Sequence, residues 1–171
     1  LVAKATQPAL PSDAGEETLA RFDKFRHAKG GLPTSTLRLQ MQRAMQSYAT
    51  VFRTGAILQE GKEALQEVWA GLADISVSDR SMIWNSDLVE TLEFDNLLLQ
   101  ATALVDSAIA RTESRVAHAR EDFPKRDDQN WMKHTLSWVD QSGAVRLDYR
   151  PVHTYTLSKD IEYIEPTARV Y

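Results

Sequence analysis

The sequence has 171 residues, of which 43% are hydrophobic and 26% are charged. A chain of this length makes one domain, and it buries about 70% of its unfolded surface without disulfides or metal ions. The lack of cysteine excludes disulfides, iron–sulfur ligation and cysteine zinc sites, and the net charge of −4 argues against nucleic-acid binding. No apolar run is long enough to span a bilayer, so we expect no direct membrane insertion.

The N-terminal residues predict a lead followed by a short helix. Residues 1–12 hold two prolines among small side chains, which indicates a linker or the cut end of a longer chain. Asp13 and Glu16 have capping-box spacing, and the apolar residues after them recur every third position. Gly30 and Gly31 are expected to end this helix.

Two further helices are predicted from apolar residues that recur with a period near 3.6. The first begins near Thr34–Thr36, and Gly55 separates it from the second, which ends before a polar loop at 76–81. Their apolar stripes are Leu37, Met41, Ala44, Met45, Tyr48, Val51 and Phe52 in one, and Ile57, Leu58, Leu65, Val68, Trp69, Leu72 and Ile75 in the other.

The longest predicted helix begins at Ser86 or Asp87 and runs to about Arg115. Its apolar residues line two sides: Leu88, Leu92, Leu99 and Ala103 on one, and Phe94, Leu97, Leu98, Ala101 and Leu104 on the other. A helix that is apolar on two sides packs between partners. We therefore expect an antiparallel bundle of three to four helices over 13–116, with this helix at its centre.

Residues 117–171 form a C-terminal segment of different character. Apolar and polar side chains alternate on both sides of a turn signal at 140–143, which predicts a small β-hairpin at about 134–149. The last twenty residues show no period and are expected to form an extended tail. The predicted fold class is thus mainly α, a helical bundle followed by a β-hairpin and a tail.

The local motifs of known cofactor and metal sites are missing from the sequence, whereas spacing alone does not decide on a Ser–His–Asp triad, because triads assemble in space. None of the seven glycines forms G-x-G, so no dinucleotide or phosphate loop is present. The four histidines lie in separate segments, and none has a second histidine three or four positions away. We therefore assign no catalytic, cofactor-binding or metal-ligating residue.

One segment at the end of the long helix is dense in charge. We define the arginine–carboxylate network as its six candidate residues, Arg111, Glu113, Arg115, His118, Arg120 and Asp122. One interpretation is a solvated helix end, where local ion pairs contribute little stability. The other is a polar network that docks the bundle on another surface, a task that suits the planar fork of arginine.

This segment and its flanks resemble the C-terminal part of the flavoprotein subunits of succinate dehydrogenase and fumarate reductase. The resemblance lies in the sequences VFR (51–53), EFDNL (93–97), RTESR (111–115), AHAREDFP (117–124), RDDQNW (126–131), KHTL (133–136), YRPV (149–152) and RVY (169–171). R-x-E-S-R is shared with L-aspartate oxidase, whereas the NWxKHTL run and the RPV segment indicate succinate dehydrogenase.

The resemblance implies a longer subunit that oxidises succinate to fumarate. Its N-terminal part would carry covalent FAD, and the catalytic and substrate-binding residues would lie there, so this chain alone is expected to be inactive and free of cofactor. The chain would be a structural and assembly domain that uses the network to contact the FAD domain, the iron–sulfur subunit or assembly factors. The same domain of a fumarate reductase, or a free-standing helical interaction module, is the alternative.

The resemblance also implies a cellular location and one departure from the family pattern. The chain, soluble by itself, would lie on the cytoplasmic face of the bacterial inner membrane, or on the mitochondrial matrix face, through partner subunits. The family usually has glycine where this sequence has Val116. If that glycine allows close backbone approach, the valine adds bulk at a contact; if it allows a positive φ, the valine is strained.

Overall fold

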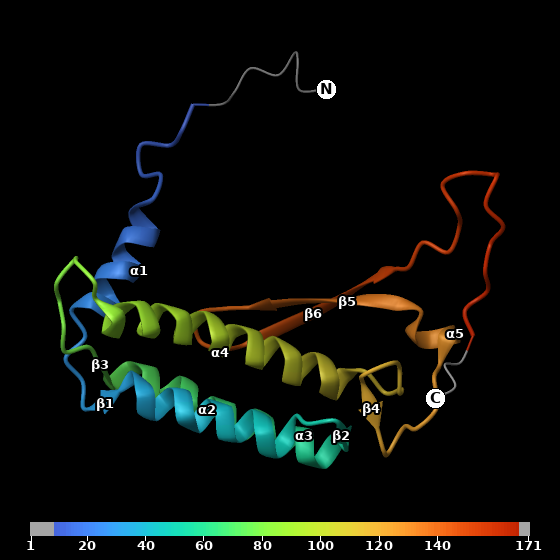
Figure 1. Ribbon diagram of the computed structural model, residues 1–171, viewed down its shortest axis with the longest axis horizontal. Helices are drawn as coiled ribbons and strands as arrows, with labels where there is room; N and C mark the ends of the chain where they lie inside the picture. The colour runs from blue at the N-terminus through green and yellow to red at the C-terminus, as the bar shows by residue number, and fades with distance from the viewer. Residues whose placement is uncertain (1–8, 168–171) are drawn as a thin grey trace.

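The computed structural model describes residues 9–167 and shows a mainly α-helical fold with a β-hairpin and an extended tail (Figure 1). The helices are α1 (Glu16–Arg26), α2 (Thr34–Tyr48), α3 (Gly55–Gly71), the 3₁₀ turn η2 (Leu72–Asp74), α4 (Ser86–Ala110) and α5 (Asp128–Trp131). The strands are β1 (Leu32–Pro33), β2 (Phe52–Arg53), β3 (Ile75–Ser76), β4 (Ala119–Arg120), β5 (Lys133–Val139) and β6 (Val145–Pro151). Most of the expected linker and the closing RVY motif lie outside the described residues.

Helices α2, α3 and α4 form the bundle, and consecutive helices run antiparallel (Figure 1). Helix α1 contacts α4 at one end, and the hairpin lies along the side of α4 that faces away from α2 and α3. The central position predicted for α4 is thus confirmed. The core between these elements includes Phe25, Leu37, Met41, Leu65, Val68, Phe94, Leu98 and Val105. Burial of each such side chain stabilises the fold by about 1.5–3 kcal/mol.

The predicted register of α4 is partly wrong. Leu98 is fully buried, but Leu97 and Leu104 are 40% and 43% exposed. The buried stripe instead contains polar side chains that a hydrophobic pattern does not reveal. Thr91 and Thr102 lie on it and donate to the carbonyls of Asp87 and Leu98, both at 2.8 Å. Because these hydroxyls find partners, the helix can bury them in place of leucine.

The predicted helix ends also need correction. Gly15, at φ 94°, precedes α1 without a side-chain cap, so Asp13 and Glu16 form no capping box. The N-cap of α4 is Asn85, whose Oδ1 accepts from the amide of Leu88 at 2.9 Å. The helix ends at Ala110 rather than near Arg115. Asparagine is as good an N-cap as serine or aspartate, so the start predicted at Ser86 or Asp87 is displaced to Asn85.

The hairpin pairs β5 and β6 in antiparallel register from Lys133↔Pro151 to Val139↔Val145. The connecting loop has five residues, 140–144, one more than the predicted turn. Asp140 Oδ1 accepts from the amides of Ser142 at 2.8 Å and Ala144 at 3.1 Å, and Gly143 takes a positive φ of 80°. The side chain of the aspartate therefore fixes the turn.

Two short parallel strand pairs, which the sequence did not predict, join distant parts of the chain. Strand β1 pairs with β3 near α1, and β2 pairs with β4 at the other end of the bundle. The second pair places Arg53 opposite Arg120 and so anchors the segment that follows α4. Within residues 9–167, every helix is too short or too polar to cross a bilayer.

Candidate functional site

The segment after α4 folds back on itself, and this brings the arginine–carboxylate network together. The backbone leaves the helix at Arg111. Arg115 and His118 then close a tight turn with reciprocal amide–carbonyl hydrogen bonds of 2.8 and 3.0 Å. Val116 lies within that turn at φ 55° and is 72% exposed. The φ of Val116 lies in the left-handed region that glycine adopts without strain, so the second of the two explanations for the family's glycine, a positive φ, fits this structure.

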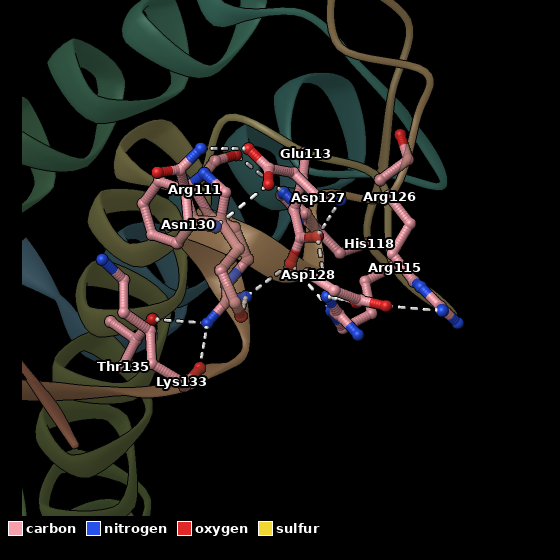
Figure 2. Close-up of polar contacts among 12 residues, drawn as sticks. Arg111, Glu113, Arg115, His118, Arg126, Asp127, Asp128, Asn130, Lys133 and Thr135 are labelled. Atoms are coloured by element: carbon pink, nitrogen blue, oxygen red, sulfur yellow. Dashed lines mark hydrogen bonds and ion pairs between the residues drawn. The ribbon is translucent and has the colours of Figure 1, made fainter. Parts of the chain in front are cut away.

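Glu113 lies at the centre of the network, and its side chain is fully buried (Figure 2). Its carboxylate accepts from Arg111 Nη1 at 2.6 Å, and from Arg115 Nε at 2.8 Å and Nη2 at 3.0 Å. The backbone amide of Asp127 donates to it at 2.9 Å. Burial alone would raise the pKa of Glu113, but the hydrogen bonds from Arg115, Asp127 and Arg111 outweigh it and lower the pKa. The buried carboxylate is therefore ionised and fully paired.

Arg120 is the second buried charge of the network, with 3% of its surface exposed. Its Nη1 donates to the carbonyls of Ala108 at 2.8 Å and Ile109 at 3.1 Å, which satisfies the C-terminal end of α4. Its other face makes a two-bond pair with Asp122, at 2.8 and 2.7 Å. Asp122 also accepts from the amide of Gly55 at 2.8 Å, so the pair joins the end of α4 to the start of α3.

The electrostatics of Asp122 follow from this pairing. The hydrogen bond from Arg120 is the main cause that lowers the pKa of Asp122 far below its usual range, and the amide of Gly55 adds to it. The carboxylate thus remains ionised at any physiological pH, and the link between α3 and α4 persists with it.

The neutral imidazole of His118 makes one hydrogen bond through each of its two ring nitrogens. Its Nδ1 lies 3.2 Å from Arg53 Nη1, and its Nε2 lies 3.2 Å from the carbonyl oxygen of Arg111. Because a guanidinium only donates, Nδ1 accepts and Nε2 carries the hydrogen. Burial lowers the pKa of His118, and the charges of Arg53, Arg120 and Arg111 lower it further. At pH 7 the imidazole is therefore a neutral bridge that accepts from Arg53 and donates to the carbonyl of Arg111.

The hydrogen bonds of the network continue to residues outside its six candidates, in the RDDQNW motif of the family resemblance. Arg115 Nη2 donates to Asp128 at 2.6 Å, and Arg126 donates to the same carboxylate at 2.6 Å (Figure 2). Arg126 also donates to the carbonyl of Pro166 at 3.1 Å, which ties the tail to the segment. In the sequence, the run of charges that continues after Pro124 could have indicated that Arg126 and Asp128 take part.

Arg111 joins the network to the hairpin, on its other side. Its guanidinium donates to the carbonyl of Lys133 at 2.6 Å and to Thr135 Oγ1 at 3.1 Å. It also lies 5.0 Å from the centre of the Trp131 ring, a cation–π distance. Arg53 lies 65 residues before His118, in the VFR motif of the family resemblance, and the β2–β4 pair brings it here.

The structure thus brings all six candidate residues into one connected set, but it corrects one expectation. If the charged heads of Arg115, His118 and Arg120 serve only docking, they should be poorly paired within this chain. They are instead paired within it, because the segment folds back over Glu113 and against α4. Across the described part of the chain, no three histidine, aspartate or glutamate side chains gather in a way that could hold a metal ion.

Comparisons with known proteins agree on one family. A sequence profile described as "Fumarate reductase flavoprotein C-term" matches residues 38–171. The chain is 54% identical to a succinate dehydrogenase flavoprotein subunit of Rickettsia bellii, over 99% of this chain and 29% of that protein. It is also 54% identical to the mitochondrial succinate dehydrogenase [ubiquinone] flavoprotein subunit of Oryza sativa, over 96% of this chain and 26% of that protein.

A solved structure shows the same fold. It is described as a quinol-fumarate reductase with menaquinol molecules, and it superposes with a TM-score of 0.80 and 33% identity. The match covers 91% of this chain and 28% of that one. The chain therefore spans less than a third of the length of the relatives that it matches.

Proposed function

This chain belongs to the succinate dehydrogenase and fumarate reductase flavoprotein family, in its C-terminal region, and from that premise we propose that it is a structural and assembly domain of a succinate dehydrogenase flavoprotein subunit. The whole subunit would oxidise succinate to fumarate with covalently bound FAD. The observation that carries the proposal is 54% identity over 99% of the chain with a succinate dehydrogenase subunit. Identity to the solved quinol-fumarate reductase is 33%.

The residues of this chain do not fit FAD. A dinucleotide site needs a strand, a glycine-rich loop and a helix whose N-terminus meets the pyrophosphate. The parallel pairs β1–β3 and β2–β4 have two residues per strand, and no G-x-G follows any strand. We therefore place the flavin and the chemistry on succinate in the part of the subunit that lies outside this chain, and this chain alone is proposed to be inactive.

The arginine–carboxylate network is proposed to dock this domain on the rest of its subunit. Its internal ion pairs support such a role, because they fix the guanidinium groups before any partner arrives. The side chains of Arg111 and Arg115 are 15% and 23% exposed, so each still offers part of its surface to a partner. The hydrogen bonds from Arg111 to β5 make the bundle (13–116) and the C-terminal segment (117–171) one unit in this proposal.

The proposed partners are the FAD domain of the same subunit, the iron–sulfur subunit and assembly factors. Through them the domain would lie at the cytoplasmic face of a bacterial inner membrane or at the mitochondrial matrix face. Fumarate reduction is the second candidate for the whole enzyme, since the matching profile and the solved structure are both described by that reaction. Comparison of succinate-dependent and fumarate-dependent turnover in the full-length subunit distinguishes the two.

The docking role is tested with Arg115→Ala in two contexts, this chain and the full-length subunit. The change should lower the melting temperature of the chain itself, because Glu113 loses two donors. The full-length subunit should in addition lose covalent flavin or assembly at temperatures well below the melting temperature of the variant chain. Normal flavin content at those temperatures would give the network an internal structural role only.

A further inference from the structure

The loop between β3 and α4 presents three consecutive large apolar side chains to solvent. Met82, Ile83 and Trp84 are 63%, 76% and 97% exposed. Single exposed apolar residues are ordinary on a protein surface, but a contiguous group that includes a tryptophan is typical of a binding surface. This loop lies outside the arginine–carboxylate network, at the opposite end of the bundle (Figure 1).

The exposure does not result from a loosely held loop, because polar contacts fix both of its ends. On the α4 side, the carboxylate of Asp87 accepts from the amide and hydroxyl of Ser78 at 2.7 and 2.9 Å. Asn85, which is 7% exposed, donates to the carbonyls of Asp79 at 2.7 Å and Ser81 at 3.0 Å. These contacts hold the backbone around residues 82–84 in one shape.

A further contact attaches the loop to the first helix. Arg26, the last residue of α1, donates from Nε to the carbonyl of Arg80 at 2.9 Å. The side chains that clamp the loop thus come from α1, from α4 and from the loop itself. Such a surface loses little conformational entropy when a partner binds it.

The backbone at Trp84 is strained, which is a separate observation. Its φ is 54°, in the left-handed region that is an outlier for bulky side chains. Conformations of this kind cost on the order of 1–3 kcal/mol and persist only where the surrounding structure imposes them. The surrounding structure here imposes a conformation that directs the largest apolar side chain of the loop into solvent. Neither the packing of the bundle nor the network gains from it.

We propose that Met82, Ile83 and Trp84 are a docking surface for the part of the flavoprotein subunit that precedes this region in its relatives. This inference rests on the proposed function and names a second contact within the same subunit. The tryptophan would fill an apolar pocket on that part of the subunit, with Met82 and Ile83 packed beside it.

The choice of this occupant rests on length and on position. More than two thirds of the Rickettsia bellii relative lies outside the region that it shares with this chain, and the family profile describes a C-terminal region. Residues 9–15, which lead into α1, lie at the same end of the molecule as the loop (Figure 1). In the relatives, the preceding part of the subunit therefore joins this region at the end of the bundle that carries the loop.

The test uses the full-length flavoprotein subunit with the photo-cross-linking residue p-benzoylphenylalanine in place of Ile83. Irradiation followed by peptide mass spectrometry should identify a cross-link to a segment that precedes residue 1, within the same polypeptide. The matched control carries the same cross-linker in place of Leu39, which is 45% exposed on α2. The control is expected to give no cross-link to that segment.

A second variant guards against a misleading cross-link. Trp84→Gly removes the side chain and the strain together, so the melting temperature of this 171-residue chain should stay the same or rise. The full-length subunit with the same change should melt at a lower temperature than its parent. Equal behaviour in the two contexts, no cross-link from position 83, or a cross-link only to another polypeptide would each overturn the inference.

The flavin content of the full-length subunit keeps the two proposals separate. A subunit that carries flavin but gives no cross-link refutes the docking surface and leaves the proposed function intact. A full-length protein that binds no flavin refutes the proposed function itself.

Discussion

Replacement of Glu113 by glutamine should destabilise this chain strongly. The side chain is fully buried and accepts four hydrogen bonds, three of them from the guanidinium groups of Arg111 and Arg115. Glutamine has nearly the same shape, but it carries no charge, and its amide group turns a donor toward a donor. Removal of one partner of a buried ion pair costs about 3–5 kcal/mol, because the remaining charges are left uncompensated.

The expected effect on melting follows from the size of the chain. For a domain of this length, each kcal/mol lowers the melting temperature by about 2–4 °C, so the variant should melt about 6–20 °C below its parent. Thermal unfolding followed by circular dichroism measures this difference. The control is Glu121→Gln, an exposed glutamate eight residues away, which should change the stability by no more than about 0.5 kcal/mol. If Glu113→Gln behaves like the control, the network contributes nothing to the fold.

Three further predictions follow from the same structure. Leu98→Ala should cost about 2–5 kcal/mol in chemical denaturation and Leu97→Ala less than about 1 kcal/mol, because only the first is buried; equal losses would contradict the register of α4. Val116→Gly should raise the stability by about 0.5–1 kcal/mol in thermal melts, since it relieves a positive φ at an exposed position, and a loss would refute the strain. Because the pKa of His118 is lowered by folding, the unfolded chain binds a proton first as the pH falls below about 6.5, so the folded state should lose stability in that range. His118→Gln should remove this pH dependence of the stability, and the control His134→Gln, at an exposed histidine, should keep it. A pH profile of stability that is unchanged in His118→Gln would contradict the neutral bridge.

The sequence predicted those features of the fold that depend on period and on turn residues. Helices α1 to α4, the antiparallel bundle and the hairpin have local signals, whereas the four-residue helix α5 was not predicted. The central place of α4 followed from apolar residues on two of its sides. The register of α4 could not be predicted fully, because Thr91 and Thr102 occupy buried positions that a hydrophobic pattern assigns to leucine. Their hydroxyl partners exist only in the folded helix.

The candidate site shows a similar division. The density of charge at 111–122 indicated a network, and the structure connects all six of its residues. The sequence suggested local ion pairs at a solvated helix end, but it did not reveal that the pairs are buried, because their burial depends on a chain reversal at Val116 and on the distant strand β2. Arg53 contacts the network only through that strand pair, and although its VFR motif belongs to the family resemblance, nothing in the sequence indicates that it meets His118.

The flavin spectrum of the purified chain, beside that of the full-length subunit, tests the central claim most directly. We expect this 171-residue chain to be colourless after incubation with FAD and dialysis into flavin-free buffer, and to reduce no dye with succinate. The full-length subunit should carry stoichiometric, covalently bound flavin and reduce the dye. Stoichiometric flavin on this chain alone, or succinate-dependent dye reduction by it, would contradict the claim that it is a structural domain whose chemistry lies elsewhere in the subunit.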